Sequence, residues 1–180
     1  MRLVVLSGPS AVGKDKIVGA ALELWGSVSI TPLTTRSPRP TETDGAEYRF
    51  VSVAAFQRLI LSDSLLVWDY LFDNYYGYGL DLAAAPAAQS SNLVVVHCLA
   101  RMALRLRAMI PDTVLVYLGS SDFALLDQRL AQRSISREEF QLRVKHRDEE
   151  ATHAPMFDLI IEDAAEMKSS DALAMIATVL

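Results

Sequence analysis

Four short apolar runs along the chain predict the buried strands of a parallel sheet. They are Leu3–Leu6, Leu93–Val96, Thr113–Leu118 and Asp158–Ile161. Elsewhere apolar residues recur at the spacing of an α-helix, which predicts helices over residues 14–25, 79–90, 99–109, 121–133, 137–153 and 165–179. Ser120 or Ser121 is the expected N-cap of the fourth helix. Because strands that alternate with helices form parallel sheets with both faces covered, the pattern predicts an α/β fold.

The stretch from Ser29 to Tyr76 breaks this alternation. It is polar, it contains Pro32, Pro38 and Pro40, and its β-type pieces are as short as Tyr48–Val51. Clustered proline and polar residues are typical of loops rather than of a regular helix–strand unit. We therefore expect an inserted lobe on the α/β core.

The segment between the first strand and the first helix is typical of a phosphate-binding loop. Gly8 and Gly13 let the backbone bend so that successive N–H groups point at phosphate oxygens. The N-terminus of the following helix adds partial positive charge, and Lys14 has the length to reach the β- and γ-phosphates. The alternative is a loop that merely contains two glycines and a lysine. The strand before it and the helix after it favour nucleotide binding.

Asp15 departs from the usual pattern of such a loop. A Ser or Thr at this position normally offers a hydroxyl to Mg²⁺, and the next residue, Lys16, has no hydroxyl either. Asp15 has three possible roles: it coordinates the metal directly, binds it through water, or only caps the helix. It is the candidate metal ligand of the chain.

Composition limits the classes of protein that fit. A length of 180 residues suits one domain with a full core. The net charge of −5 argues against a general nucleic-acid binder, and Cys98 as the single cysteine excludes an internal disulfide. No apolar stretch approaches the roughly 18 residues of a membrane span, and the first run is too short for a secretory signal. We expect a cytoplasmic protein that binds neither nucleic acid nor membranes.

Three further regions carry candidate phosphate-binding side chains. Thr34–Pro40 places Arg36 and Arg39 on a proline-stiffened segment, where guanidinium groups bind phosphate bidentately or simply face solvent. The tyrosines of Tyr75–Gly79 form a predicted turn. In the last third, arginines form either a solvated face or a mobile lid that neutralises a transferring phosphoryl group. They are Arg129, Arg133, Arg137, Arg143 and Arg147.

Taken together, these motifs resemble the guanylate kinase family of nucleoside monophosphate kinases. The resemblance extends in order through Gly8–Ser10, Thr34–Pro40, Asp44–Val51, Asn74–Gly77, Arg129–Arg133 and Phe157–Ile161. It implies a P-loop core at residues 1–28, 79–120 and 155–180, an acceptor-binding lobe at 29–78 and a helical lid at 121–154. It also implies phosphoryl transfer from ATP, with Mg²⁺, to a small phosphorylated substrate. We expect a monomer or a homodimer.

The resemblance assigns roles to individual residues. It implies that Lys14, Arg133 and Arg143 act in catalysis. It implies that the acceptor phosphate is held by Arg36, Arg39, Tyr48 and Tyr76. The implied ATP-binding residues are Gly8, Pro9, Ser10, Ala11, Val12, Gly13, Lys14, Asp15, Arg129 and Arg133. No histidine needs a role, because phosphoryl transfer depends on positioning and charge neutralisation.

The guanine-reading positions of the family are changed in this chain. Where the family has a serine, a glutamate and another serine or threonine, alignment through the motifs places Pro32, Val67 and Tyr78. Proline and valine have no side-chain donor or acceptor, and tyrosine is far larger. Acidic residues of the family near the end of the central strand are also missing, with Val96–Cys98 there instead.

These changes lead to a main interpretation and two alternatives. The main interpretation is an ATP-dependent phosphotransferase that acts on a nucleoside monophosphate or sugar phosphate and reads guanine weakly. Gly-Lys-Asp in the loop, and Tyr76-Gly77-Tyr78-Gly79, are similar to ribose 1,5-bisphosphate phosphokinases, although Thr34–Val51 is closer to guanylate kinases. The first alternative is a true guanylate kinase. The second, from a different class, is a phospho-ligand binding module with little catalysis.

Overall fold

The structure, a computed structural model, describes residues 2–82, 93–133 and 135–180. The chain divides into two compact units, the first formed by Met1–Ser29 with Ser91–Leu180 and the second by Ile30–Ser90. Most of the helix predicted at residues 79–90 lies outside the described residues, and Gly79 itself ends a strand. The division of the chain into core, acceptor lobe and lid stays a prediction.

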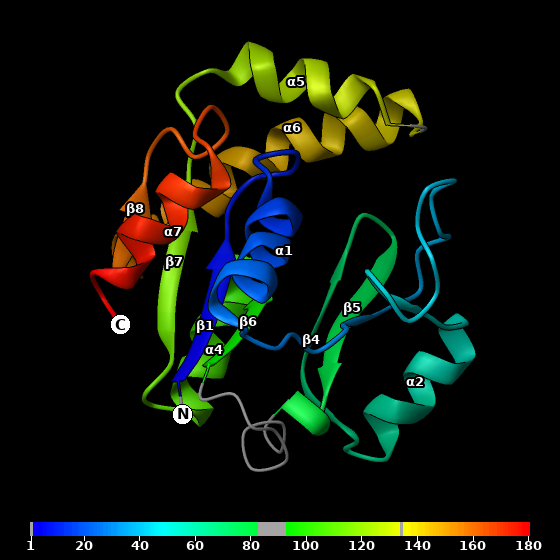
Figure 1. Ribbon diagram of the computed structural model, residues 1–180. Coiled ribbons are helices and arrows are strands. Elements are labelled where there is room, and N and C mark those ends of the chain that lie inside the picture. Colours follow the sequence, from blue (N-terminus) through cyan, green and yellow to red (C-terminus); the bar gives the residue numbers. More distant parts are fainter. Residues whose placement is uncertain (1, 83–92, 134) are drawn as a thin grey trace. The chain divides into compact units, whose positions relative to one another are not determined.

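The first unit contains a parallel sheet of four strands (Figure 1). In spatial order the strands are β6 (Leu93–His97), β1 (Arg2–Ser7), β7 (Val114–Leu118) and β8 (Leu159–Ile161). Every neighbouring pair runs parallel. The central strands are almost completely buried, which explains why their sequences are continuously apolar rather than alternating. The predicted α/β fold is confirmed.

Helices cover both faces of this sheet (Figure 1). On one face α1 (Lys14–Trp25) packs against α7 (Ser169–Ala177), and on the other α4 (Ala100–Met109) packs against β1 and β7. Beyond the carboxyl ends of the strands, α5 (Phe123–Ala131) packs against α6 (Arg137–Thr152), and a short 3₁₀ helix follows at Ala154–Met156. Within the described residues, no helix combines the length and the apolar character needed to cross a bilayer.

The helix after β7 begins later than predicted. Its N-cap is Asp122, whose side chain accepts a hydrogen bond from the Leu125 N–H at 2.8 Å. The predicted capping residue Ser121 instead donates its hydroxyl to Asp163 Oδ1 at 2.6 Å. Both residue types cap helices well, so a long-range partner decides which of them does so. The last helix likewise starts at Ser169 rather than at residue 165.

The described residues of the second unit include a mixed sheet and a helix that packs against it. The strands lie in the order β3 (Arg49–Phe50), β2 (Leu33–Thr34), β5 (Asn74–Gly79) and β4 (Leu65–Leu71), and the helix is α2 (Val53–Leu61). The predicted lobe with short β pieces therefore contains a full hairpin and a helix that the pattern did not predict. The tyrosine-rich segment, predicted as a turn, is strand β5.

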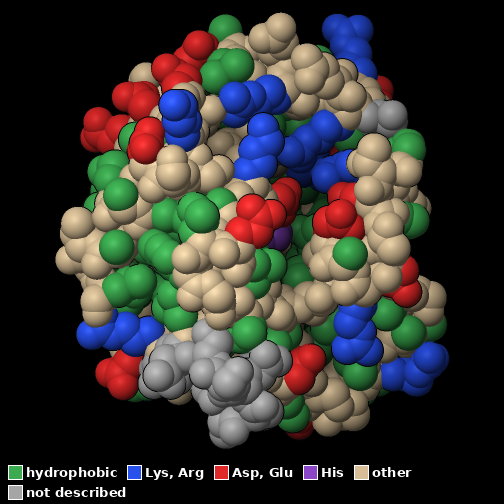
Figure 2. All heavy atoms as spheres, viewed as in Figure 1, with side chains coloured by type: hydrophobic (Ala, Val, Ile, Leu, Met, Phe, Trp, Pro, Cys, Tyr) green, Lys and Arg blue, Asp and Glu red, His purple; other side chains and the backbone are tan. Residues whose placement is uncertain are grey.

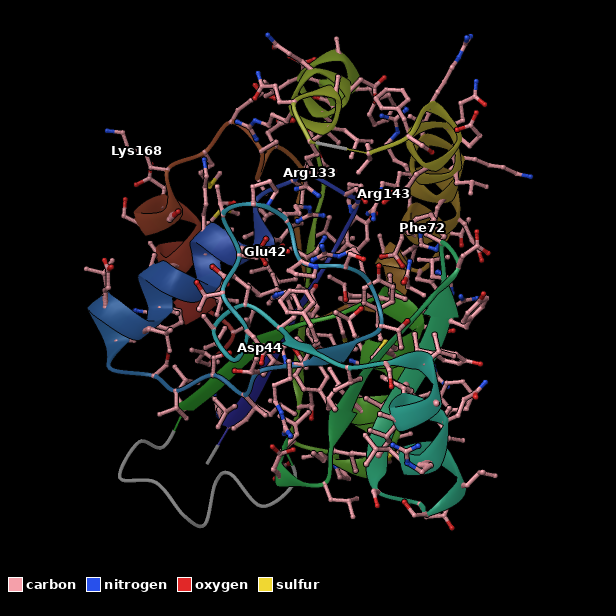
Figure 3. All side chains as sticks on the ribbon, turned by 90° about the vertical axis from the view of Figure 1, so that its right-hand side faces the viewer. Glu42, Asp44, Phe72, Arg133, Arg143 and Lys168 are labelled. Carbon is pink, nitrogen blue, oxygen red and sulfur yellow. The ribbon has the colours of Figure 1, made fainter. Side chains whose placement is uncertain are left out.

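The hairpin turns at Phe72 and Asp73. Both residues have positive φ, 52° and 57°, as a two-residue type I′ turn requires. The Asn74 side chain donates to the Phe72 carbonyl at 2.7 Å and closes the turn. Phe-Asp is an unusual pair for this conformation, which Asn-Gly normally occupies, so the sequence carries no hairpin signal here. Phe72 is labelled at this tip in Figure 3.

Candidate active site

Residues 8–15 join β1 to α1 and include the first two residues of that helix; this segment is called the nucleotide loop. Gly8 has φ +140°, and a Cβ added there would lie 2.1 Å from the Leu118 carbonyl oxygen. Ala11 and Gly13 also have positive φ, 69° and 107°. At the end of the loop the N–H groups of Lys16 and Ile17 donate to the Gly13 carbonyl and start α1. Backbone bends and a helix N-terminus therefore meet here, as the motif predicts.

Lys14 folds across the nucleotide loop. Its Nζ donates to the carbonyl oxygens of Gly8 at 2.6 Å and Pro9 at 2.9 Å. Burial lowers the pKa of Lys14 from its ordinary value, although the charges of Glu150 and Asp15 raise it. The ammonium group is thus held by neutral backbone dipoles at the mouth of the loop, where it can turn to a phosphate oxygen.

Arg133 and Arg143 place positive charge beside Lys14. Arg143, which is 7% exposed, donates from Nη1 to the Ser10 hydroxyl at 3.2 Å and from Nη2 to Glu139 at 2.6 Å. Both guanidinium groups lower the pKa of Lys14 further, after the effect of burial. Figure 3 labels both residues, and in Figure 2 Lys and Arg side chains gather in the upper part of the view, over α5 and α6.

Two other arginines of this region have structural contacts. Arg147 donates to Asp127 at 2.9 Å and lies over the Phe123 ring at 4.3 Å, so it ties α6 to α5. Arg129 donates to the Ala165 carbonyl at 2.8 Å. Its assignment to ATP binding stays a prediction.

A carboxylate–imidazole pair lies at the start of α1. His97 Nε2 and Asp15 Oδ1 are 2.9 Å apart, with the His97 side chain 13% exposed and that of Asp15 64% exposed. Desolvation by itself raises the pKa of Asp15, but the hydrogen bond and charge of His97 lower it overall. Sequence reasoning missed this pair. Since β6 runs parallel to β1 with His97 beside Leu6, alignment of the strand ends was the signal that could have found it.

In the second unit, residues 35–48 form a segment called the arginine loop, and both of its arginines contact Glu42. Arg36 Nη2 donates to both Glu42 carboxylate oxygens at 2.9 Å. Arg39 donates to Glu42 from Nη1 at 3.0 Å and from its backbone N–H at 2.7 Å. Glu42, labelled in Figure 3, is only 8% exposed at its side chain. Sequence reasoning missed it, although an acid three residues after Arg39 was visible.

The two predicted tyrosines lie against the same arginine. The Arg36 guanidinium is 5.4 Å from the Tyr48 ring centroid, and the Tyr48 and Tyr76 centroids are 6.3 Å apart. Thr34 fixes the start of the loop, since its hydroxyl donates to the Tyr75 carbonyl and accepts from the Arg36 N–H. The structure therefore brings the four predicted acceptor-phosphate residues together within one unit.

Comparisons with known proteins identify the family. The family model described as Guanylate kinase matches residues 1–178. The chain belongs to the guanylate kinase family. Guanylate kinase of Thermobifida fusca is 36% identical, with 98% of this chain and 91% of that protein covered, and that of Gloeobacter violaceus is 38% identical, with 87% and 77% covered. The crystal structure of guanylate kinase from Anaplasma phagocytophilum has the same fold, with a TM-score of 0.73, 21% identity and 98% and 82% coverage.

Within this guanylate kinase fold, Val67 and Tyr78, two of the three positions aligned with the guanine-reading residues of the family, lie in the same hairpin as Tyr76, the tyrosine predicted to bind phosphate. Val67 pairs directly with Tyr78 across the hairpin, and Asp69 pairs with Tyr76. Since alternate residues of a strand share a face, Tyr76 and Tyr78 point to the same side of the sheet. Val67 and Tyr78 are 3% and 1% exposed, so neither presents a flexible polar group at the surface.

A buried carboxylate also influences the nucleotide loop. Glu150 of α6 is 3% exposed, and its two oxygens accept from the Ala100 N–H at 3.1 and 3.3 Å. It therefore caps α4, whose own N-cap, Leu99, has no capping side chain. Burial raises the pKa of Glu150, against the lowering effect of Lys14.

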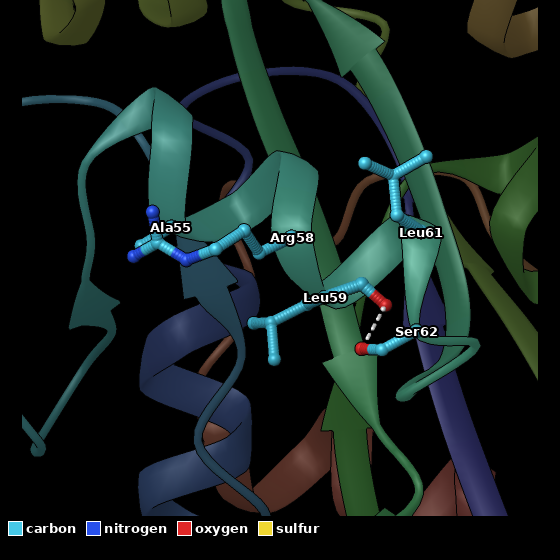
Figure 4. Close-up of a pocket in the computed structure, with 5 residues that line it drawn as sticks. All are labelled: Ala55, Arg58, Leu59, Leu61 and Ser62. Carbon is cyan, nitrogen blue, oxygen red and sulfur yellow. Dashed lines mark hydrogen bonds between the residues drawn. The ribbon is translucent and has the colours of Figure 1, made fainter.

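An open hollow lies along α2, with a volume of about 520 Å³ (Figure 4). It is lined by Ala55, Arg58, Leu59, Leu61 and Ser62. None of the predicted site residues lines it. The predicted phosphate-binding residues lie elsewhere, in the nucleotide loop of the first unit and in the arginine loop of the second.

Proposed function

We propose that this protein transfers a phosphoryl group from ATP to the phosphate of a nucleoside monophosphate, and that guanylate is its acceptor. The observation that carries the proposal is the presence, in one chain of the guanylate kinase family, of two groups of side chains whose chemistry suits phosphate. The first unit supplies the nucleotide loop with Lys14. The second supplies Arg36, Arg39, Tyr48 and Tyr76 around one point. The named relatives favour guanylate over the other acceptors that the sequence left open.

The donor residues fit ATP with a divalent metal ion. Gly8 lies where a Cβ would strike the Leu118 carbonyl, so the loop backbone keeps the close bend that phosphate binding needs. Lys14 would hold the β- and γ-phosphates, and Asp15 occupies the position at which such loops usually carry the metal-binding hydroxyl. A bound divalent ion would neutralise part of the charge on these phosphates.

The chain's own contribution to the reaction is positioning and charge. Lys14, Arg133 and Arg143 would surround the transferring group with positive charge, and these interactions strengthen as negative charge spreads over its oxygens. Arg36 and Arg39 would orient the acceptor phosphate through charge-assisted hydrogen bonds. A general base is not required of any residue. The lid role of residues 121–154 belongs to this proposal.

A second candidate function keeps the same chemistry with another acceptor, such as a sugar phosphate. The observation that favours it is the set of changed positions Pro32, Val67 and Tyr78. A buried guanine edge without partners loses about 1–3 kcal/mol for each unpaired polar group. Two or three such groups would reduce guanylate specificity by roughly 10² or more. The third possibility is a binding module without catalysis. It is disfavoured because the nucleotide loop retains both of its glycines and its lysine.

Steady-state kinetics test these proposals. ADP formation would be measured with ATP and a panel of nucleoside monophosphates and sugar phosphates, including ribose 1,5-bisphosphate. The proposed function requires GMP to have the highest kcat/KM of the panel. A sugar phosphate that exceeds GMP would establish the second candidate, and the absence of acceptor-dependent turnover with every compound would leave the binding module.

A further inference from the structure

The pair formed by Asp15 and His97 joins two elements that meet only in the folded chain. Asp15 is the second residue of α1, and His97 is the last residue of the neighbouring strand β6. The two side chains approach to 2.9 Å. Asp15 remains 64% exposed, so an ion and its water ligands have access to the carboxylate. His97 is held more firmly, because only 13% of its side chain is exposed.

These two positions correspond to the protein ligands of metal ions in phosphate-loop enzymes generally. There the loop supplies a Ser or Thr hydroxyl, and the end of a sheet strand supplies a carboxylate. In this chain a different type of ligand stands at each position. The loop position carries a carboxylate, Asp15, and the strand end carries an imidazole, His97.

The separation of the pair suits shared coordination. Two ligands at about 2.1 Å from one ion, at right angles to each other, lie about 3.0 Å apart. Oδ1 and Nε2 lie 2.9 Å apart. For both to bind one ion, the proton between them must leave, and the ring must turn so that Nε2 points at the ion instead of at Oδ1.

We propose that Asp15 and His97 together bind the divalent ion that accompanies the nucleotide, and that this carboxylate–imidazole pair favours a first-row transition ion such as Mn²⁺ over Mg²⁺. Mg²⁺ takes oxygen ligands in a nearly ideal octahedron, whereas imidazole is a better ligand for transition ions. The inference rests on the proposed function, because it needs nucleotide bound to the loop.

The nucleotide is also needed to complete the coordination. Among the residues that the structure describes, no group of three or more His, Cys, Asp and Glu side chains is placed to hold a metal ion. Two protein ligands leave the remaining positions of an octahedron to phosphate oxygens and water. We therefore expect tight Mn²⁺ binding only when nucleotide is present.

Pulsed electron paramagnetic resonance of bound Mn²⁺ tests the assignment directly. The probe is Mn²⁺ with the methylene-bridged ATP analogue AMP-PCP, which has no bridging nitrogen. Wild-type protein should show nitrogen coupling from a directly bound imidazole, and labelling of histidine with ¹⁵N should change that coupling to the ¹⁵N pattern. Adenine nitrogens are excluded in this way, because they stay unlabelled.

Variants extend the test to metal preference. Relative to AMP-PCP alone, wild-type protein should raise the ratio of Mn²⁺ to Mg²⁺ affinity by about tenfold or more. His97→Gln should lose both this excess and the nitrogen coupling, and Asp15→Ser, which restores the usual hydroxyl, should lose much of the excess. His153→Gln, which removes an imidazole beyond the end of α6, is the matched control and should retain both.

The outcomes separate the two proposals. Calorimetry would first measure binding of AMP-PCP with Mg²⁺ to wild-type protein. Failure to bind would overturn the proposed function and this inference together. Binding of the nucleotide with no nitrogen coupling in wild-type protein, or with the same Mn²⁺ preference in His97→Gln, would overturn the metal assignment alone.

Discussion

The nucleotide loop and the arginine loop hold their cations in different ways. Lys14 donates only to carbonyl oxygens of its own loop in the contacts observed, at 2.6 and 2.9 Å. Arg36 and Arg39 instead share one carboxylate, Glu42, at 2.9 and 3.0 Å. The ammonium group is therefore oriented by neutral dipoles, and the guanidinium pair is oriented by a full negative charge.

This difference has a consequence for phosphate binding. Under the proposed function, a phosphate that meets Lys14 replaces two neutral acceptors, and the ammonium charge is offset only in part by Glu150 and Asp15. A phosphate that meets the arginines finds them already partly neutralised by Glu42, but with their geometry fixed in advance. The first arrangement favours strength of attraction, and the second favours pre-organisation.

The largest effect is expected from Lys14→Ala. The substitution removes the ammonium charge that is proposed to meet the β- and γ-phosphates, so we expect a loss of roughly 3–4 kcal/mol in transition-state stabilisation, about a hundredfold or more in kcat. The measurement is ADP formation at saturating acceptor. Lys16→Ala, at the exposed neighbouring lysine, is the control and should change the rate little. Near-normal turnover of folded Lys14→Ala protein would show that the nucleotide loop is wrongly assigned.

A smaller loss is expected when one arginine is removed. A hydrogen bond to a charged group contributes about 1.5–3 kcal/mol, so Arg36→Ala should lower kcat/KM for the acceptor by about 10- to 100-fold. Arg39→Ala should lower kcat/KM less, because the remaining Arg36 is still held in place over the rings of Tyr48 and Phe50. Arg58→Ala, on α2 of the same unit, is the control. Equal kinetics of the Arg36 and Arg58 variants would remove the arginine loop from the acceptor site.

Glu42→Gln tests which of two effects of the carboxylate dominates. If pre-organisation dominates, as we expect, the weaker hold on both arginines should raise the acceptor KM by about tenfold and leave kcat unchanged. Glu42→Asp keeps the charge on a shorter side chain and should fall between this variant and wild type. A lower KM in Glu42→Gln would show instead that the carboxylate competes with the acceptor phosphate.

The smallest effect concerns Glu150, the carboxylate that influences Lys14 without a direct contact. Because burial raises its pKa in the folded protein, the folded chain keeps a proton that the unfolded chain has already released. Stability from this group is therefore lost as the pH rises from the ordinary glutamate pKa through the folded-state pKa. Glu150→Gln should have a higher Tm than wild type, by about 2–4 °C for each kcal/mol gained in the free energy of unfolding. This difference in Tm, the gap between the two proteins, should widen from pH 5 to pH 8.

Differential scanning fluorimetry across this pH range measures the difference in Tm. Binding of a nucleotide analogue to Glu150→Gln checks that the nucleotide loop is still intact. Gln keeps an acceptor for the Ala100 N–H, so the cap of α4 should survive. A gap that is constant with pH would mean that the pKa of Glu150 is not raised in the folded protein.

The first unit was largely predictable because its signals are local. The buried strands are continuous apolar runs, and α1, α4 and α5 bury apolar residues at helical spacing, whereas α6 buries the charged residues Arg143 and Glu150. The nucleotide loop follows from strand, glycines and helix in direct succession. The contacts that tune it are not local, since Glu150 caps a helix that begins 50 residues earlier and His97 reaches Asp15 from the neighbouring strand. Such partners are invisible until the sheet order is known.

The fold of the second unit was harder to predict, because its glycines suggest a turn in the sequence but lie within a strand in the structure. Gly77 and Gly79 made the tyrosine-rich segment typical of a turn. In the structure a Cβ at Gly77 would lie 2.9 Å from the Val67 carbonyl oxygen and 3.0 Å from the Phe56 ring. The glycine therefore permits close packing inside a strand, while Phe72 and Asp73 form the turn. The sequence analysis predicted no role for Glu42, because its importance depends on two arginines that fold back onto it.

The short bridge between Val28 and Val94 gives the chain an unusual modularity. Val28 donates to the Leu93 carbonyl at 3.1 Å and accepts from the Val95 N–H at 2.9 Å. The chain thus leaves the first unit and re-enters it at neighbouring points of one ladder. Everything inserted between these points could be exchanged with the equivalent segment of a relative, or replaced by a brief glycine-rich connection, without cutting the sheet that carries the nucleotide loop. Under the proposed function, acceptor choice is therefore a graftable property, which evolution or an engineer can change while the unit that carries the nucleotide loop is inherited intact.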